Sequence, residues 1–193
     1  MSPPRKYLVP FLCAVVACPA FVFLHELAHY LAGACLGSGG KLHYAQVTGN
    51  IRPTWQAGAA AVVVSAGPLL QVGLAVTGFV WLRKLRRDHR EAAPTLGDWL
   101  ATTLALNAAR WLRGLTGSPS DPQPPDEALL SCYIGLPAWF LPYLLVLVAV
   151  IVIIAILRLH PPGGRLLPFL SWGLGGVISY LLWMKLAGPF LLP

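Results

Sequence analysis

Residues 7–36 read YLVPFLCAVVACPAFVFLHELAHYLAGACL, an apolar run whose only strongly polar members are His25, Glu26 and His29. About 20 helical residues cross the hydrocarbon core of a bilayer, so a helix over this run is long enough to span it. Ionisable groups at membrane depth cost free energy, and they usually mark a functional site. The run therefore predicts a membrane helix with a polar site on one face.

The spacing of these three residues indicates metal chemistry. Two histidines four positions apart lie on the same face of a helix, where both rings can bind one zinc ion. Glu26, which follows His25 directly, can accept a proton from a zinc-activated water. The hypothesis is a zinc protease whose site lies within the membrane. The alternative is a buried polar cluster that bonds to neighbouring helices and holds no metal.

The composition places the whole chain in the membrane class. Hydrophobic residues make up 56% of the 193 residues and charged residues only 11%, whereas soluble domains carry about 25% charged residues. We expect a single integral membrane domain over 1–193, all-α in class. The net charge of +7 follows the loops, so it indicates membrane orientation rather than nucleic-acid binding.

Apolar stretches of sufficient length predict about five transmembrane helices. Their expected bounds are Tyr7–Leu36, Gln56–Leu82, Leu96–Leu115, Leu136–Leu157 and Leu166–Leu186.

The segment after the first helix differs in kind. Gly37 is expected to end the helix. Leu42–Thr48 has the composition of a short strand and Gly49-Asn50 that of a turn, so we expect a small β-hairpin. Such an edge could pair with an unwound substrate segment, with His43 nearby, and an ordinary surface loop is the alternative.

The alternation of the expected spans supplies a topological argument for a third zinc ligand. The histidines lie toward the carboxyl end of the first span, and alternating spans put the loop between spans three and four on that same side. Catalytic zinc usually has three protein ligands. The acidic residues of that loop and one residue of the hairpin are the candidates: Asp121, Asp126, Glu127 and His43.

Three stretches resemble one protein family. FLHELAHYLAG (Phe23–Gly33), SAGPLLQ (Ser65–Gln71) and DEALLSCYIGLP (Asp126–Pro137) are similar to motifs of the site-2 protease family of intramembrane zinc metalloproteases. The resemblance implies a protease core over about 7–137 and two additional helices over about 136–186. It further implies that His25, His29 and Asp126 hold zinc and that Glu26 activates water.

Departures from the family pattern keep some alternatives open. Glu127 stands where the family has a glycine after its aspartate, and Asp121 is an alternative ligand. Basic residues cluster in Arg83–Glu91, which puts the site on the outer side by the positive-inside rule. The family's site generally opens toward the cytosol instead.

The resulting functional hypothesis is a zinc metalloendopeptidase that cleaves membrane-spanning or membrane-proximal segments. Its expected partners are a membrane-protein substrate and the lipid bilayer, with no nucleic acid, and we expect a multi-pass protein of the cell membrane. Asn107 is expected to bond either substrate backbone or a neighbouring helix, and Arg110 and Arg113 to extend to the lipid surface. The alternatives are a non-proteolytic chaperone or assembly factor on the same scaffold, and a metal transporter.

Overall fold

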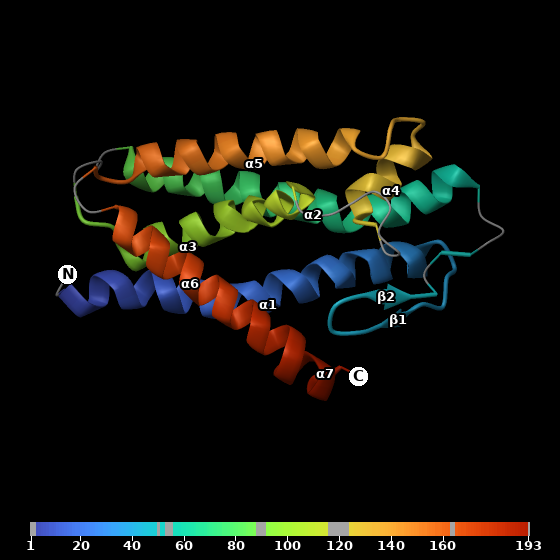
Figure 1. Cartoon of the computed structure of the whole chain (residues 1–193), viewed down its shortest axis with the longest axis horizontal. Coiled ribbons are helices and arrows are strands. Elements are labelled where there is room, and N and C mark those ends of the chain that lie inside the picture. The colour runs from blue at the N-terminus through green and yellow to red at the C-terminus, as the bar shows by residue number, and fades with distance from the viewer. Residues whose placement is uncertain are drawn as a thin grey trace.

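The computed structural model describes residues 3–49, 51–52, 56–87, 92–115, 124–162 and 165–192. The chain is an all-α membrane protein with one small hairpin after its first helix, as the sequence predicted. Four of its described helical segments are long and apolar enough to cross a membrane: α1, α2, α5 and the run from α6 to α7. Figure 1 shows α2, α3 and α5 packed together, with α6 crossing α1 obliquely.

The first two long helices carry the predicted motifs. Helix α1 (Pro3–Cys35) continues through two internal prolines. It ends where predicted, because Gly37 has φ +79° and the Ser38 amide donates to the Gly33 carbonyl at 2.9 Å. Positive φ costs glycine little, which is why it commonly follows a helix. Helix α2 (Ala57–Arg86) then packs along α1.

The third predicted segment keeps its bounds but changes form. Helix α3 (Leu96–Ala105) passes directly into the 3-10 helix η1 (Leu106–Leu115). With rises of about 1.5 Å and 2.0 Å per residue, the two together extend roughly 35 Å. The segment is therefore comparable in length with the hydrocarbon core, although only half of it is α-helical.

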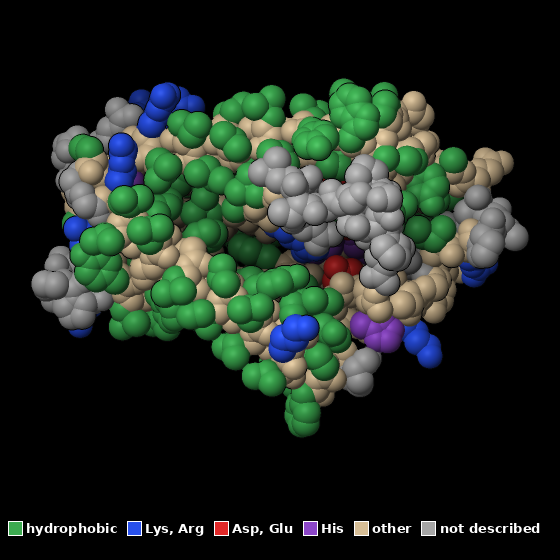
Figure 2. Space-filling view, viewed as in Figure 1, with side chains coloured by type: hydrophobic (Ala, Val, Ile, Leu, Met, Phe, Trp, Pro, Cys, Tyr) green, Lys and Arg blue, Asp and Glu red, His purple; other side chains and the backbone are tan. Residues whose placement is uncertain are grey.

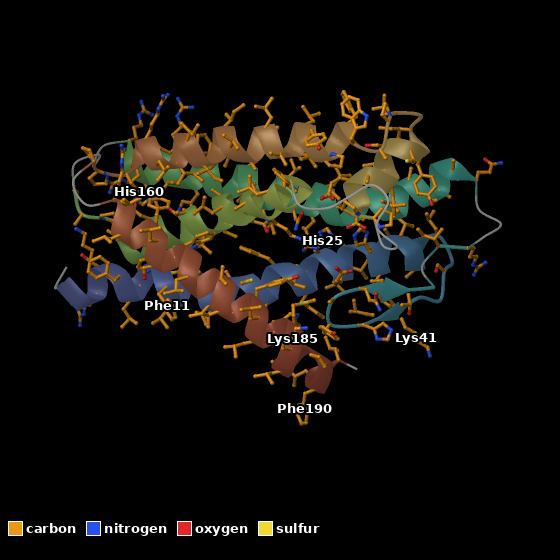
Figure 3. All side chains as sticks on the ribbon, in the orientation of Figure 1. Phe11, His25, Lys41, His160, Lys185 and Phe190 are labelled. Atoms are coloured by element: carbon orange, nitrogen blue, oxygen red, sulfur yellow. The ribbon has the colours of Figure 1, made fainter. Side chains whose placement is uncertain are left out.

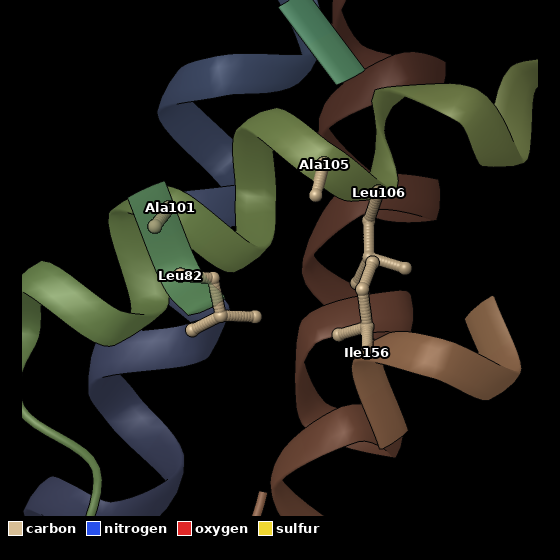
Figure 4. Close-up of a cluster of buried hydrophobic side chains, with 5 residues drawn as sticks. All are labelled: Leu82, Ala101, Ala105, Leu106 and Ile156. Atoms are coloured by element: carbon tan, nitrogen blue, oxygen red, sulfur yellow. The ribbon is translucent and has the colours of Figure 1, made fainter. Parts of the chain in front are cut away.

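The last elements complete the bundle. Short helix α4 (Asp126–Tyr133) precedes α5 (Phe140–Leu159), and α6 (Leu166–Leu182) runs through the π-helical η2 (Trp183–Ala187) into α7 (Gly188–Leu191). A buried apolar cluster lies where α2, α3, η1 and α5 meet (Figure 4). Its members are Leu82, Ala101, Ala105, Leu106 and Ile156.

The hairpin is confirmed, but its predicted strand and turn are wrong. The strands are β1 (Lys41–Leu42) and β2 (Val47–Thr48), paired antiparallel, so the turn falls inside the stretch predicted to be one strand. The predicted turn at Gly49-Asn50 lies past β2, and Asn50 is outside the described residues. The turn is held by the C-terminal elements, since the Trp183 indole donates to the Tyr44 carbonyl at 3.0 Å. A contact between residues so far apart in the sequence cannot be predicted from the residues around the turn.

A polar cluster at the far end of the bundle joins four elements. His160 is 3% exposed, its Nε2 is hydrogen-bonded to the Thr102 hydroxyl at 2.8 Å, and its ring packs against those of Trp99 and Phe169. Burial and the charge of Arg86 lower the pKa of His160 from its ordinary 6.5 to about 4. In Figure 3, His160 lies near one end of the bundle and His25 nearer its middle.

Acidification should therefore destabilise the fold through His160. The unfolded side chain takes up a proton near pH 6.5, whereas the folded one stays neutral until about pH 4. The contribution of His160 to the free energy of unfolding is fully present above pH 6.5. About 3 kcal/mol of stability is lost as the pH falls toward 4. The free energy of unfolding in detergent, measured at several pH values, should fall more for the wild type than for His160→Gln. Equal pH dependence of the two proteins would contradict this assignment.

Candidate metal centre

The polar face of α1 is buried inside the bundle. His25 is 1% exposed and His29 is 5% exposed, and their Nε2 atoms lie 3.1 Å apart. One helical turn separates the two residues, so both rings leave α1 in the same direction, toward α2 and α4. Figure 3 shows His25 directed into the space between α1 and α2. The rings are therefore shielded from lipid by protein.

Asp126 comes to these rings from the other half of the chain. Its Oδ2 lies 2.9 Å from His25 Nε2 and 3.3 Å from His29 Nε2. Burial raises the pKa of Asp126, but the side chains of His25 and His29 beside it lower the pKa further than burial raises it. The net effect favours the ionised carboxylate, which is the form that binds metals.

The turn between α4 and α5 orients Asp126. Gly135 has φ +77°, which allows the chain to reverse directly after α4. The fully buried Ser131 accepts a hydrogen bond from the Leu141 amide at 3.1 Å and donates to the Glu127 carbonyl at 2.9 Å. These bonds couple α4 to the start of α5, and α4 also packs against α2.

The three ligand atoms fit a tetrahedral zinc site. Zinc binds imidazole nitrogen and carboxylate oxygen at about 2.0–2.2 Å, so two ligands at a tetrahedral angle lie roughly 3.3 Å apart. The observed separations of 2.9, 3.1 and 3.3 Å match that edge length. Among the described residues this is the one group of three or more such side chains that converges closely enough to hold an ion. Three protein ligands leave a fourth position for water or substrate.

A backbone contact sets the tautomer of one histidine. His29 Nδ1 lies 2.7 Å from the Val63 carbonyl of α2, so this nitrogen donates and carries the proton. Nε2 of His29 is then left with its lone pair toward the centre, as a metal ligand requires. His25 Nδ1 differs, since it is buried with no hydrogen-bond partner among the described residues.

Glycine at position 67 permits the close approach of α2. A Cβ atom built on Gly67 would lie 2.4 Å from His29 Nε2 and 2.5 Å from His25 Cε1. Any larger side chain would therefore displace both rings. Gly67 belongs to the SAGPLLQ motif, and small residues let neighbouring membrane helices approach closely.

Glu26 points along a different direction from the two histidines. Its side chain is 9% exposed and lines a cavity between α1, η1 and α6. Arg110 Nη2 lies 4.0 Å from Glu26 Oε1. The prediction that Arg110 extends to the lipid surface is therefore wrong, because the 3-10 turn of η1 aims it at the carboxylate. The side chain of Arg113 lies outside the described residues.

The remaining predicted site residues fall in three groups. Asn107 lines the same cavity as Glu26, and its Nδ2 donates to the Gln71 carbonyl at 3.4 Å, so it joins two helices at the edge of the site. His43 is hydrogen-bonded to Thr48 within the hairpin, outside the ligand group. Glu127 is also outside that group, and Asp121 is not among the described residues.

Arg110 is the site residue that sequence analysis missed. It follows Asn107 by three positions, and residues three apart share a face in a 3-10 helix. That spacing would have paired Arg110 with Asn107 had the change of helix type at Leu106 been foreseen.

Comparisons with known proteins give this chain no relative. No family model, no curated protein and no solved structure matches it. The resemblance to the site-2 protease family therefore rests on the motif residues alone.

Proposed function

We propose that this chain is a zinc-dependent endopeptidase that hydrolyses peptide bonds of membrane-spanning or membrane-proximal segments. The observation that carries the proposal is the convergence of His25, His29 and Asp126 at tetrahedral spacing, with Glu26 next to His25 in the chain. A bound zinc ion supplies a Lewis acid that acidifies water and polarises a carbonyl. The donor set, two neutral imidazoles and one carboxylate, is a combination that such catalytic sites use.

Glu26 is the proton carrier in this proposal. Its carboxylate takes a proton from the attacking water, whose oxygen bonds to the carbonyl carbon of the substrate. When the carbon–nitrogen bond breaks, Glu26 returns that proton to the leaving amine. Arg110 Nη2 lies 4.0 Å from Glu26 Oε1, so a guanidinium faces the carboxylate that accepts the proton.

The surroundings of Glu26 suit a substrate that comes from the membrane. The four apolar helical segments support a multi-pass protein, which we place in the cell membrane. A helical substrate hides its backbone amides, so it must unwind near the site before cleavage. The hairpin borders the cavity through Ala45, where it could hold an unwound strand.

Glu26→Gln is the variant that tests catalysis. Purified in detergent, it should keep the zinc content of the wild type, because it leaves the three ligands in place. Its rate of cleavage of fluorescein-labelled casein should fall by about 100- to 10,000-fold, since general base catalysis contributes that much. Zinc is measured by mass spectrometry on the same samples.

Two other results would refute the proposal. Zinc-loaded wild type that cleaves neither casein nor any membrane-segment peptide would favour the assembly-factor alternative on the same scaffold. Zinc transport into vesicles that Glu26→Gln leaves unchanged would favour a transporter. The variant and the wild type should otherwise elute identically from size exclusion, which controls for misfolding.

A further inference from the structure

A cavity of about 660 Å³ lies between α1, η1 and α6 and has Glu26 in its wall. Pockets that bind ligands typically measure about 300–1,000 Å³. Figure 2 shows a hollow in the centre of this face, with apolar side chains in its depth and charged side chains at one side. The volume is therefore large enough for apolar side chains of a bound peptide.

The polar groups of the cavity are gathered near Glu26. Asn107 and Arg110 of η1 line it beside that carboxylate. The hydroxyl of Thr103 is occupied elsewhere, since it accepts a hydrogen bond from the Trp172 indole at 3.0 Å. Most other lining residues are aliphatic, aromatic or glycine. A substrate bond placed at Glu26 thus leaves the neighbouring part of the substrate in an apolar space.

Two adjacent glycines of α6 have opposite surroundings. A Cβ on Gly175 would lie 2.6 Å from the Phe11 carbonyl, so Gly175 closes the crossing of α6 with α1. A Cβ on Gly176, or on Gly173 one turn away, would meet no atom within 4 Å. Both of these latter glycines line the cavity. Their missing side chains keep space open that a larger residue would fill.

Hydrogen bonds to α1 and α3 hold the α6 wall in place. Ser171 and Ser179 donate to the carbonyls of Tyr7 and Val15 on α1, at 2.8 and 2.6 Å. Together with the Trp172–Thr103 bond, these contacts fix α6 on both sides of the cavity. Its width is thus set by side-chain size at the glycine positions.

We infer that this cavity binds a large apolar side chain of the substrate next to the bond that is cut, and that Gly176 sets its size. The inference rests on the proposed function, since it takes Glu26 to be the group beside the reacting bond. The substrate class is then an unwound membrane segment with Leu, Phe or Met near the cleavage point. Helix α6 lies outside the stretch that resembles the protease core, so this specificity belongs to the additional helices.

The test compares Gly176→Leu with Gly73→Leu. Gly73 is an exposed glycine of α2 whose Cβ would also meet nothing within 4 Å, so it controls for the cost of the substitution in a helix. Membrane-segment peptides that differ at one position, Ala, Leu or Phe, are digested and the cuts identified by mass spectrometry. Gly176→Leu should cleave the Leu and Phe peptides roughly tenfold more slowly and the Ala peptide nearly normally. Gly73→Leu should match the wild type.

A second readout is independent of cleavage. Cys18 lines the cavity, so a variant with Cys13, Cys35 and Cys132 replaced by alanine and Glu26 by glutamine reports on binding alone. The Phe peptide should slow alkylation of Cys18 by a small maleimide, and adding Gly176→Leu should abolish that protection. Protection in this uncleaving variant would show that the cavity binds an apolar side chain even where the wild type proves inactive, so failure of the binding site and failure of the proposed function are told apart.

Three outcomes would overturn the inference. One is an unchanged size preference in a Gly176→Leu protein that still cleaves. Another is alkylation of Cys18 at the same rate with and without the Phe peptide. The third is Cys18 shielded by lipid in vesicles and unaffected by peptide, which would make the cavity a site for acyl chains.

Discussion

Asp126→Ala is expected to lose its bound zinc and, with it, all detectable peptide cleavage. The wild type should hold about one zinc per chain with three protein ligands. The variant keeps two buried imidazoles and no anionic ligand, and its affinity for zinc should fall by more than about 100-fold, beyond what the loss of a supporting hydrogen bond costs. Zinc content after gel filtration and a competition titration with a chelator measure both quantities.

Asp121→Ala and Glu127→Ala are the matched controls. Each removes one carboxylate close to Asp126 in the sequence, so net charge changes equally in all three variants. Glu127 lies outside the converging group, although it directly follows Asp126. We expect both controls to keep wild-type zinc content. Zinc lost from Asp121→Ala and retained by Asp126→Ala would show that the third ligand is Asp121.

Gly67→Ala should weaken zinc binding by a steric effect alone, because it leaves all three ligands in the chain. The added Cβ would sit 2.4 Å from His29 Nε2 and 2.5 Å from His25 Cε1, closer than real contacts allow. Either the rings turn away or α2 moves off α1, and in both cases the ligand atoms lose their spacing. We expect zinc affinity to drop at least as far as the roughly 10- to 100-fold seen when supporting groups are removed. Overpacking should also lower the free energy of unfolding by about 1–3 kcal/mol.

Gly73→Ala separates this effect from a general one. Gly73 lies on the same helix with open space around its Cβ position. Alanine is the better helix former, by about 1 kcal/mol, so this control should be as stable as the wild type or more stable. Wild-type zinc affinity in Gly67→Ala, measured by the same chelator titration, would mean that α2 does not confine the histidines.

Local geometry accounts for the part of the centre that could be predicted from the sequence. The His25–His29 pair follows from the helical repeat, and the apolar runs follow from the thickness of a bilayer. Asp126 was a candidate because of the alternation of spans and the family resemblance. In the structure its Oδ2 lies 2.9 Å from His25 Nε2 and 3.3 Å from His29 Nε2. Asp121 remained an equal candidate by topology, because alternation selects a side of the membrane and no single residue.

The hairpin and the third helix show where local patterns stop. A stretch with strand composition over Leu42–Thr48 folds back on itself because Tyr44 is held by Trp183, nearly 140 residues away. Segment Leu96–Leu115 changes to a 3-10 helix at Leu106, where Asn107 bonds the backbone of α2. Neither Trp183 nor the α2 backbone could be identified as a partner from the residues that neighbour the hairpin or the 3-10 helix.

Composition and helical spacing alone determined that this is an all-α membrane protein with two imidazoles and a carboxylate on one helix. Tertiary packing decided what surrounds them: Asp126 beside the imidazoles, Arg110 beside Glu26, and an open cavity under α6. The division has a physical cause. Hydrophobicity and helix period are properties of neighbouring residues, whereas a metal centre and its cavity require atoms from helices that meet only when the bundle closes.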